Sequence, residues 1–274
     1  RGNSAPGGFL SDEDEGLIYV ALSRNNTLGV VDLETRKVVD EIPVGIAPYT
    51  VLRRDDKAYV TNWGGHRPEE GDTTGPTSGS EAVVDPETGI ASTGSVTVVD
   101  LQQRKPVKEI AVGLHPSEMA LSPDGARLYI ANANSDTVTV IDTGVDEVID
   151  TFGTKPMAEL PFGSAPNALA VSPDGATLYV ANGGNNLLAV LDAKTGRLKG
   201  LIPTGWYPGS MLLARGGDLL CVANIKGRGG HYTDANVPLK LEMFGEKWHG
   251  YNTHDYLGSV SFIDVPDAEA LDSY

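Results

Sequence analysis

"VSPDGATLYVANGGNNLLAVLD", residues 171–192, contains the pattern that decides the fold. It holds two short apolar runs, "LYVAN" and "LLAVLD", with turn-forming residues before and between them. Short apolar runs bounded by Gly, Pro, Asn and Asp are typical of β-strands joined by tight turns. The Pro-Asp-Gly sequence ahead of the first run predicts one such turn.

The same pattern returns along the whole chain. Each version of "LYVAN" is followed by a second apolar run that ends in Asp, and further apolar runs precede and follow this pair. A unit of about forty residues with four strands is characteristic of a β-propeller blade. The anchors occupy residues 18–22, 58–62, 128–132, 178–182 and 220–224, and the aspartates are Asp32, Asp100, Asp142, Asp192 and Asp264.

We therefore predict an all-β fold, a β-propeller of four-stranded blades, with residues 1–274 as a single domain. The fifth unit ends without a clear fourth strand. Three arrangements remain open. The five units form a small ring by themselves, they belong to a six- or seven-bladed ring with more chain, or a partner supplies the missing strands. The predicted units cover about residues 2–44, 45–112, 113–161, 162–204 and 205–265.

The composition argues against several classes of function and site. The net charge of −16 opposes general binding to nucleic acid or to anionic membrane surfaces, since both depend on basic patches. The sequence has no run of eighteen apolar residues, so it predicts no transmembrane helix. Cys221 is the only cysteine, which excludes an internal disulfide and a cysteine-based zinc site; a buried structural thiol is the simpler interpretation.

Two insertions, residues 63–94 and 225–257, interrupt the pattern between the second and third strands of their units. In a meander, these connections and those between successive units meet at the same end of the strands, where a smaller extension at 153–163 also falls. Long loops in a compact domain are usually functional or disordered. All five histidines and all three tryptophans fall on this end: His66, His115, His231, His249, His254, Trp63, Trp206 and Trp248, with Tyr49 and Tyr207 beside them.

This end is the predicted ligand-binding face, because histidine and aromatic side chains suit recognition. Lys226 and Arg228, in "KGRGG", add an anion contact as one interpretation; the other is a structural joint, since the P-loop spacing is absent. The candidate binding residues are His66, His115, Trp206, Tyr207, Lys226, Arg228, His231, Trp248, His249 and His254.

A metal ion, Zn²⁺ or Ca²⁺, is a further hypothesis for the second insertion. His231, His249, His254 and Asp255 have suitable donor atoms, but no H-E-x-x-H or EF-hand pattern orders them. Solvated loop histidines are the alternative. No G-x-S-x-G or C-x-x-C-H motif is present, so the sequence predicts no catalytic residue and no cofactor beyond that ion.

The pattern "SPDG-x-x-LYVAN … VTVID" resembles the YVTN family of β-propeller repeats over nearly the whole chain. The last third, "IPTGWYPGSMLLARGGDLLCVANIKGRGG" and "YLGSVSFIDVPDAEALDSY", resembles the propeller half of bacterial proteins that join such repeats to an alkaline-phosphatase-like phosphoesterase domain. The resemblance implies a periplasmic or extracellular location. It carries no catalytic residue into residues 1–274, because the phosphoesterase segment of that family follows this point.

Three hypotheses for function follow. The first is a non-catalytic binding or scaffold module, the propeller part of a larger phosphoesterase-like protein, with a protein partner or a further C-terminal domain. The second is a propeller enzyme, a hydrolase or lyase with a metal on the histidine face. The third is a structural cell-surface or assembly protein. The acidic charge and the exposed edge of the last strand are compatible with this role and with a homo-oligomer.

Overall fold

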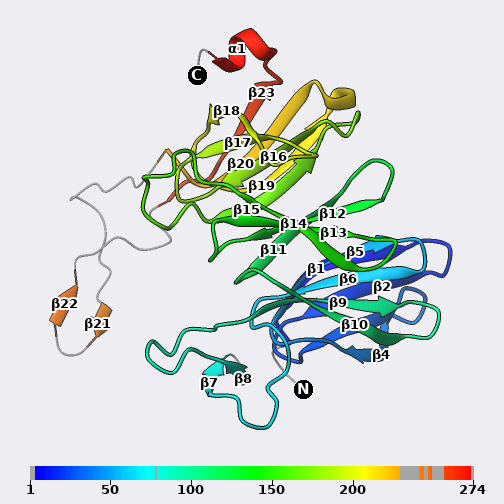
Figure 1. The fold of residues 1–274 in the computed structure, drawn as a ribbon. Helices are drawn as coiled ribbons and strands as arrows, with labels where there is room; N and C mark the ends of the chain where they lie inside the picture. Colours follow the sequence, from blue (N-terminus) through cyan, green and yellow to red (C-terminus); the bar gives the residue numbers. More distant parts are fainter. Residues whose placement is uncertain (1–3, 78, 229–240, 244–245, 249–255, 273–274) are drawn as a thin grey trace.

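The computed structural model describes residues 4–77, 79–228, 241–243, 246–248 and 256–272, which are almost entirely antiparallel β-strand (Figure 1). The predicted all-β propeller fold is confirmed. Four sheets have four strands each, a fifth has three, and each pairs neighbours in a simple meander. In Figure 1 the sheets follow one another from the blue end to the orange end of the chain.

We number the sheets as blades in chain order. Blade 1 comprises β1 (Pro6–Asp12), β2 (Leu17–Leu22), β3 (Thr27–Asp32) and β4 (Lys37–Pro43). Blade 2 comprises β5 (Pro48–Arg54), β6 (Lys57–Asn62), β9 (Gly94–Asp100) and β10 (Lys105–Val112). Blade 3 comprises β11 (Pro116–Leu121), β12 (Arg127–Asn132), β13 (Thr137–Asp142) and β14 (Glu147–Gly153).

Blade 4 comprises β15 (Pro166–Val171), β16 (Thr177–Asn182), β17 (Leu187–Asp192) and β18 (Leu198–Pro203). Blade 5 comprises β19 (Trp206–Ala214), β20 (Leu219–Gly227) and β23 (Ser259–Asp264), with the short turn η1 (Arg215–Gly217) between the first two. Two small hairpins lie in the insertions: β7 (Thr74–Thr77) with β8 (Ser80–Val83), and β21 (Leu241–Met243) with β22 (Glu246–Trp248).

The repeated aspartates close turns. Asp32 accepts a hydrogen bond from the backbone N–H of Thr35 at 2.6 Å, and Asp192 accepts one from the N–H of Thr195 at 3.0 Å. The side-chain hydroxyl of each threonine bonds to the same carboxylate, which holds the pKa of both aspartates below the ordinary value. The repetition of Asp at the third strand is therefore structural.

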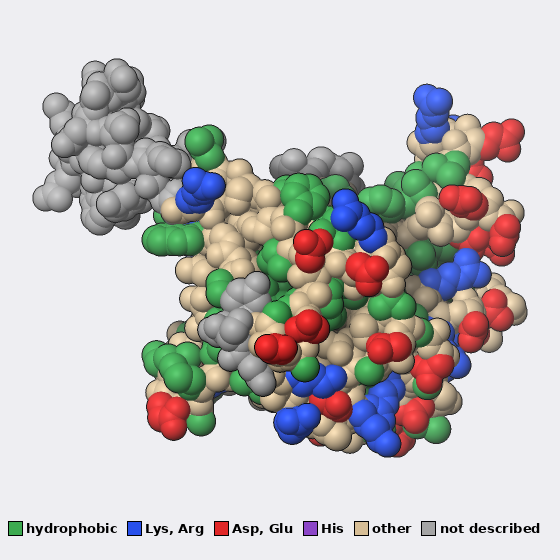
Figure 2. Space-filling view, turned by 90° about the horizontal axis from the view of Figure 1, so that it is seen from above, with side chains coloured by type: hydrophobic (Ala, Val, Ile, Leu, Met, Phe, Trp, Pro, Cys, Tyr) green, Lys and Arg blue, Asp and Glu red, His purple; other side chains and the backbone are tan. Residues whose placement is uncertain are grey.

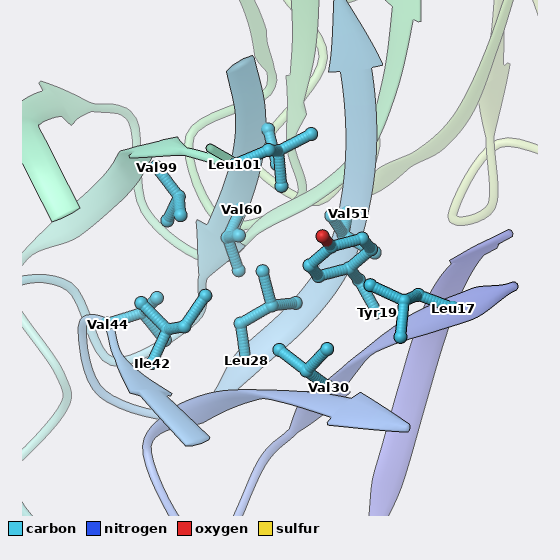
Figure 3. Packing of buried hydrophobic residues seen from close by; sticks show 11 residues of the cluster. Leu17, Tyr19, Leu28, Val30, Ile42, Val44, Val51, Val60, Val99 and Leu101 are labelled. Atoms are coloured by element: carbon cyan, nitrogen blue, oxygen red, sulfur yellow. The ribbon is translucent and has the colours of Figure 1, made fainter. Parts of the chain in front are cut away.

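The core consists of four apolar clusters, each between two consecutive blades. Figure 3 shows the first, in which Leu28 and Val30 of blade 1 face Val60 and Val99 of blade 2. The innermost strands, β1, β5, β11, β15 and β19, contact one another in that order. Stacking of successive sheets thus buries the face that a single sheet leaves open.

The last blade is incomplete among the described residues. β23 pairs with β20, and in the described part of the chain no strand pairs with its other edge. The chain continues into α1 (Ala268–Asp272), which packs on β18 of blade 4 through Leu271. Gly200 makes room for it, since a Cβ atom there would lie 2.4 Å from the Leu271 Cγ.

The hairpins β7–β8 and β21–β22 project from the same side of the stacked sheets in Figure 1. That side carries the connections between β6 and β9 and between β20 and β23, as well as the turns between blades. We call it the insertion end, and the side with the short turns inside each blade the turn end. No helix in the described part of the chain has the length and apolar character needed to cross a membrane.

Candidate functional site

The same turn recurs at the insertion end, at the start of every blade. Each blade begins with a residue in the left-handed conformation directly before a proline: Ala5, Ala47, His115, Ala165 and Tyr207, with φ between 46° and 57°. A non-glycine residue with positive φ is uncommon and costs of order 1 kcal/mol. Three blades place the small Ala there. Blades 3 and 5 place His and Tyr instead.

The preceding blade fixes this strained turn. The Asn186 side-chain oxygen of blade 4 accepts the backbone N–H of Tyr207 at 2.9 Å, and Asn26 of blade 1 does the same for Ala47 at 2.9 Å. A second bond follows on the other side, since the Trp63 N–H donates to the Ala47 carbonyl at 3.1 Å. Hydrogen bonds thus hold the backbone of the turns at Ala47 and Tyr207 in place.

Three aromatic rings stack on this frame. The Tyr49 and Trp63 rings, both from blade 2, have centroids 4.4 Å apart and planes 16° apart. The Trp63 and His115 rings lie 5.6 Å apart at 20°, which links blade 2 to blade 3. Trp63 is 39% exposed, so part of the stack faces solvent. Burial lowers the pKa of His115, which keeps the imidazole neutral near pH 7.

A carboxyl group and a second tyrosine lie near Tyr49, one member of the stack. Glu118, in β11, is half-buried, and burial raises the pKa of its carboxyl group above the ordinary value. The pKa of Tyr49 is raised by its burial and further by the charges of Glu118 and Tyr207. Tyr49 of blade 2 therefore lies within electrostatic reach of Glu118 in blade 3 and of Tyr207 in blade 5.

Tyr207 also takes part in a cationic contact. The Lys226 ammonium lies 4.9 Å from the centre of the Tyr207 ring and 5.6 Å from that of Tyr256. Both tyrosines thus form the walls around one cation. Gly183 of blade 4 lies beside this ring: a Cβ atom there would lie 3.3 Å from the Tyr207 ring and 2.3 Å from the Asn167 amide nitrogen.

We call Tyr49, Trp63, His115, Glu118, Tyr207 and Lys226 the rim cluster. It brings together three of the residues predicted from sequence: His115, Tyr207 and Lys226. Glu118 and Tyr256 were not singled out by the sequence analysis, and Tyr49 and Trp63 were placed on this end without being named as binding residues. Comparison between repeats carries the missing signal: at the positions of Trp63 and Glu118, blade 3 has Ala133 and blade 4 has Ala168, respectively.

The other predicted residues lie apart from the rim cluster. His66 is 3.8 Å from the Asp72 carboxylate, in a hollow between blades 1 and 2 that Pro43 and Glu109 also line. Trp206 is exposed opposite Gly227, and Arg228 is exposed after it. His231, His249, His254 and Asp255 lie outside the described residues, and so does the side chain of Trp248.

The metal hypothesis stays a prediction for that reason. Within the described residues, no group of three or more His, Cys, Asp or Glu side chains is placed to hold a metal ion. The beginning of the second insertion is held by packing, because a Cβ atom on Gly227 would lie 1.9 Å from the Leu257 carbonyl oxygen. A glycine is required at this joint, independently of any anion contact at Lys226 and Arg228.

The chemistry of the rim cluster suits binding. It offers flat aromatic surface, a neutral imidazole, a carboxyl group and a cation, beside turns whose backbone is hydrogen-bonded to the preceding blade. Fold and site together define a β-propeller with an elaborated insertion end.

Comparison with known proteins supports this class. No family model matches the chain, and no curated protein matches it by sequence. Among solved structures it resembles hydrazine synthase of Kuenenia stuttgartiensis, with a TM-score of 0.66, 21% identity, and coverage of 97% of this chain and 64% of the other. It also resembles the β-propeller domain of Cps50 (Swd1) from Myceliophteria thermophila, with a TM-score of 0.60, 14% identity, and coverage of 82% and 63%.

A third match is a chain of the mitotic checkpoint complex, with a TM-score of 0.59, 12% identity, and coverage of 80% of this chain and 57% of the other. At these identities the likeness concerns the fold alone. The matched part spans less than two thirds of each of these three chains.

Proposed function

We propose that this chain is a non-catalytic binding module that holds a protein partner at its insertion end, through the rim cluster. One observation carries the proposal. His115 and Tyr207 stand where blades 1, 2 and 4 have Ala, and Trp63 stands where blades 1, 3 and 4 have Ser, Ala and Gly. The Trp63 and His115 rings stack across blades 2 and 3, and Tyr207 contacts Lys226 within blade 5. A purely structural turn needs none of them.

The partner that we propose is a phosphoesterase-like catalytic domain, on the ground of the sequence resemblance of residues 202–230 and 256–274. A periplasmic or extracellular location belongs to the same proposal. Reading the gene on both sides of residues 1–274 tests this part. A segment with the Asp and His metal-binding motifs of alkaline-phosphatase-like enzymes is expected; a gene without one contradicts the phosphoesterase partner and leaves the binding role to the next test.

The binding role is tested by hydroxyl-radical footprinting of Trp63. Its oxidation is compared in purified residues 1–274 and in the assembly purified from the native cell. Protection by about tenfold is expected in the assembly, because a bound partner covers the stack. Leu198, exposed at the turn end, is the internal control and should be oxidised equally in both. Equal oxidation of Trp63 in both samples would contradict the proposal.

The repeats supply matched variants for the same experiment. Trp63→Ala, His115→Ala and Glu118→Ala each introduce the residue that a sister blade carries at that position, so the fold should tolerate them. Each is expected to weaken recovery of the partner by about tenfold, the effect of removing one central contact from an interface. Val145→Ala, on the exposed turn end of blade 3, should leave recovery unchanged.

A further inference from the structure

The outer face of blade 5 is an uncovered apolar sheet. Leu212, Cys221 and Phe262 lie side by side in one row across the three strands, and Ser210, Ala223 and Val260 form the next row. Leu212, Val260 and Phe262 are all exposed, and Phe262 is 71% exposed. No described element packs against this face. Figure 2 looks down on this end of the molecule and shows hydrophobic side chains at the surface there, between charged ones.

The same face of blade 4 is an established interface. There the equivalent rows are Ala170, Tyr179 and Val190, and Ala168, Ala181 and Leu188. All six residues are buried against blade 5, and Val190, which corresponds to Phe262, is only 3% exposed. Blade 5 thus repeats, row by row, a surface that elsewhere in this chain is covered by the next blade.

The opposite end of the chain has the complementary surface. Phe9 of blade 1 is 67% exposed, whereas Val51, at the same position of blade 2, is 7% exposed because blade 1 covers it. Leu33 is likewise exposed where Leu101 of blade 2 is buried. One end therefore lacks a following blade and the other lacks a preceding one.

We propose that the outer face of blade 5 is a docking surface for β-propeller blades supplied from outside residues 1–274. The docked sheet is antiparallel and four-stranded, and it presents aliphatic residues of the kind that Val51, Val60 and Val99 present to blade 1. Such blades fill the gap between blades 5 and 1 and cover both free faces at once. The matched propeller structures, of which more than a third lies outside the match, contain chain enough for this.

A second copy of this chain is a less suitable occupant of the outer face of blade 5. If blade 1 of one copy packed on blade 5 of another, each pair would again present one free face at either end. Such a head-to-tail contact grows into an open chain unless its rotation closes. Intervening blades close the ring without that growth.

Cys221 is a built-in reporter, because it is the only cysteine and lies half-buried in the middle of the face. Its rate of reaction with a maleimide is measured in purified residues 1–274 and in the assembly purified from the native cell. Reaction is expected to be at least about tenfold slower in the assembly, where a docked blade leaves only local opening as a route to the thiol. Equal rates in both samples overturn the proposal.

The identity of the occupant is tested by a photo-crosslinker. p-Benzoylphenylalanine in place of Phe262 in the natively expressed protein should link to a strand of a β-blade repeat from outside residues 1–274. The same group in place of Val145, at the exposed turn end of blade 3, is the control and should give no such link. A link into residues 6–43 of a second copy, with Cys221 protection that disappears on dilution, overturns the proposal in favour of self-association. A link into a protein without blade repeats overturns it as well. Neither outcome bears on Trp63, so failure here is distinguishable from failure of the proposed function.

Discussion

Blades 4 and 5 have nearly the same sequence pattern and the same strand register, but they differ in what covers them. In blade 4 the row Ala170, Tyr179 and Val190 is buried; in blade 5 the equivalent row ends in Phe262, which is largely exposed. A strand pattern therefore specifies that a face is apolar, and the neighbouring sheet decides whether that face stabilises the protein. Variants that exchange residues between the two blades separate the contribution of the strand pattern from that of the neighbouring sheet.

The largest difference is expected for a charge on the two equivalent positions. Val190→Asp buries an unpaired carboxylate between blades 4 and 5 and should lower the free energy of unfolding by about 4 kcal/mol or more. Phe262→Asp places the same charge in solvent and should change it by less than about 0.5 kcal/mol. Urea unfolding of residues 1–274 measures both. A large loss for Phe262→Asp would mean that its face is already covered in the isolated chain.

An exchange of the second-strand tyrosine sharpens the comparison. Tyr179→Cys leaves a cavity between blades 4 and 5 and should cost about 3 kcal/mol. Cys221→Tyr restores the residue of the other repeats in blade 5 and should change stability by less than about 0.5 kcal/mol, since no described neighbour buries the new ring. Thermal unfolding of the two variants under identical conditions gives the difference. A stabilising Cys221→Tyr would contradict an uncovered face.

These exchanges also show what the sequence could predict. The anchors at residues 18–22 and 178–182 predicted β2 and β16, because turn residues and alternating apolar residues act within a few positions of each other. The role of Asp32 and Asp192 in turns followed from the same local chemistry. Repetition strengthened each of these predictions, because the same local signal occurs five times in the chain.

The rim cluster could be predicted only in part. Trp63 and His115 are far apart in the sequence, and their stacking depends on how blades 2 and 3 sit together. Glu118 lies inside an ordinary strand, and only alignment with Ala168 of the next repeat distinguishes it. His66 was predicted on the same face as Trp63, but it lines a separate hollow with Pro43 and Glu109. Contacts between blades are a property of packing that strand patterns do not encode.

The second-strand tyrosines predict a pH dependence that blade 5 does not share. Burial raises the pKa of Tyr19, Tyr59, Tyr129 and Tyr179, and for Tyr59 a hydrogen bond to Asp146 adds to it. A phenol with a raised folded-state pKa stabilises the fold below the unfolded value of about 10, and this contribution falls as the pH rises above it. Stability should therefore decline above about pH 10.

Urea unfolding measures this decline between about pH 8 and pH 11, the range in which tyrosine ionises. Absorbance at 295 nm follows the ionisation itself. The buried tyrosines should ionise only as the protein unfolds. The variant Cys221→Tyr provides the control, because its new phenol in the uncovered blade 5 should ionise near the ordinary pKa without loss of stability. Ionisation of all tyrosines near pH 10 in the folded protein would contradict the burial of their hydroxyl groups.

The smallest effect is expected where blade 5 carries Tyr207 and blade 4 carries Ala165. Tyr207→Ala makes the two blade starts alike and removes one ring from Lys226, so it should cost about 0.5–1 kcal/mol, the value of an exposed cation–π contact. Ala tolerates the left-handed conformation at this position in blades 1, 2 and 4. Thermal unfolding should therefore change little, while footprinting should show Trp63 of the native assembly more exposed, because the partner is held less tightly. A loss well above 1 kcal/mol would instead assign Tyr207 to the packing of blade 5 on blade 4, and it would remove this residue from the proposed binding surface.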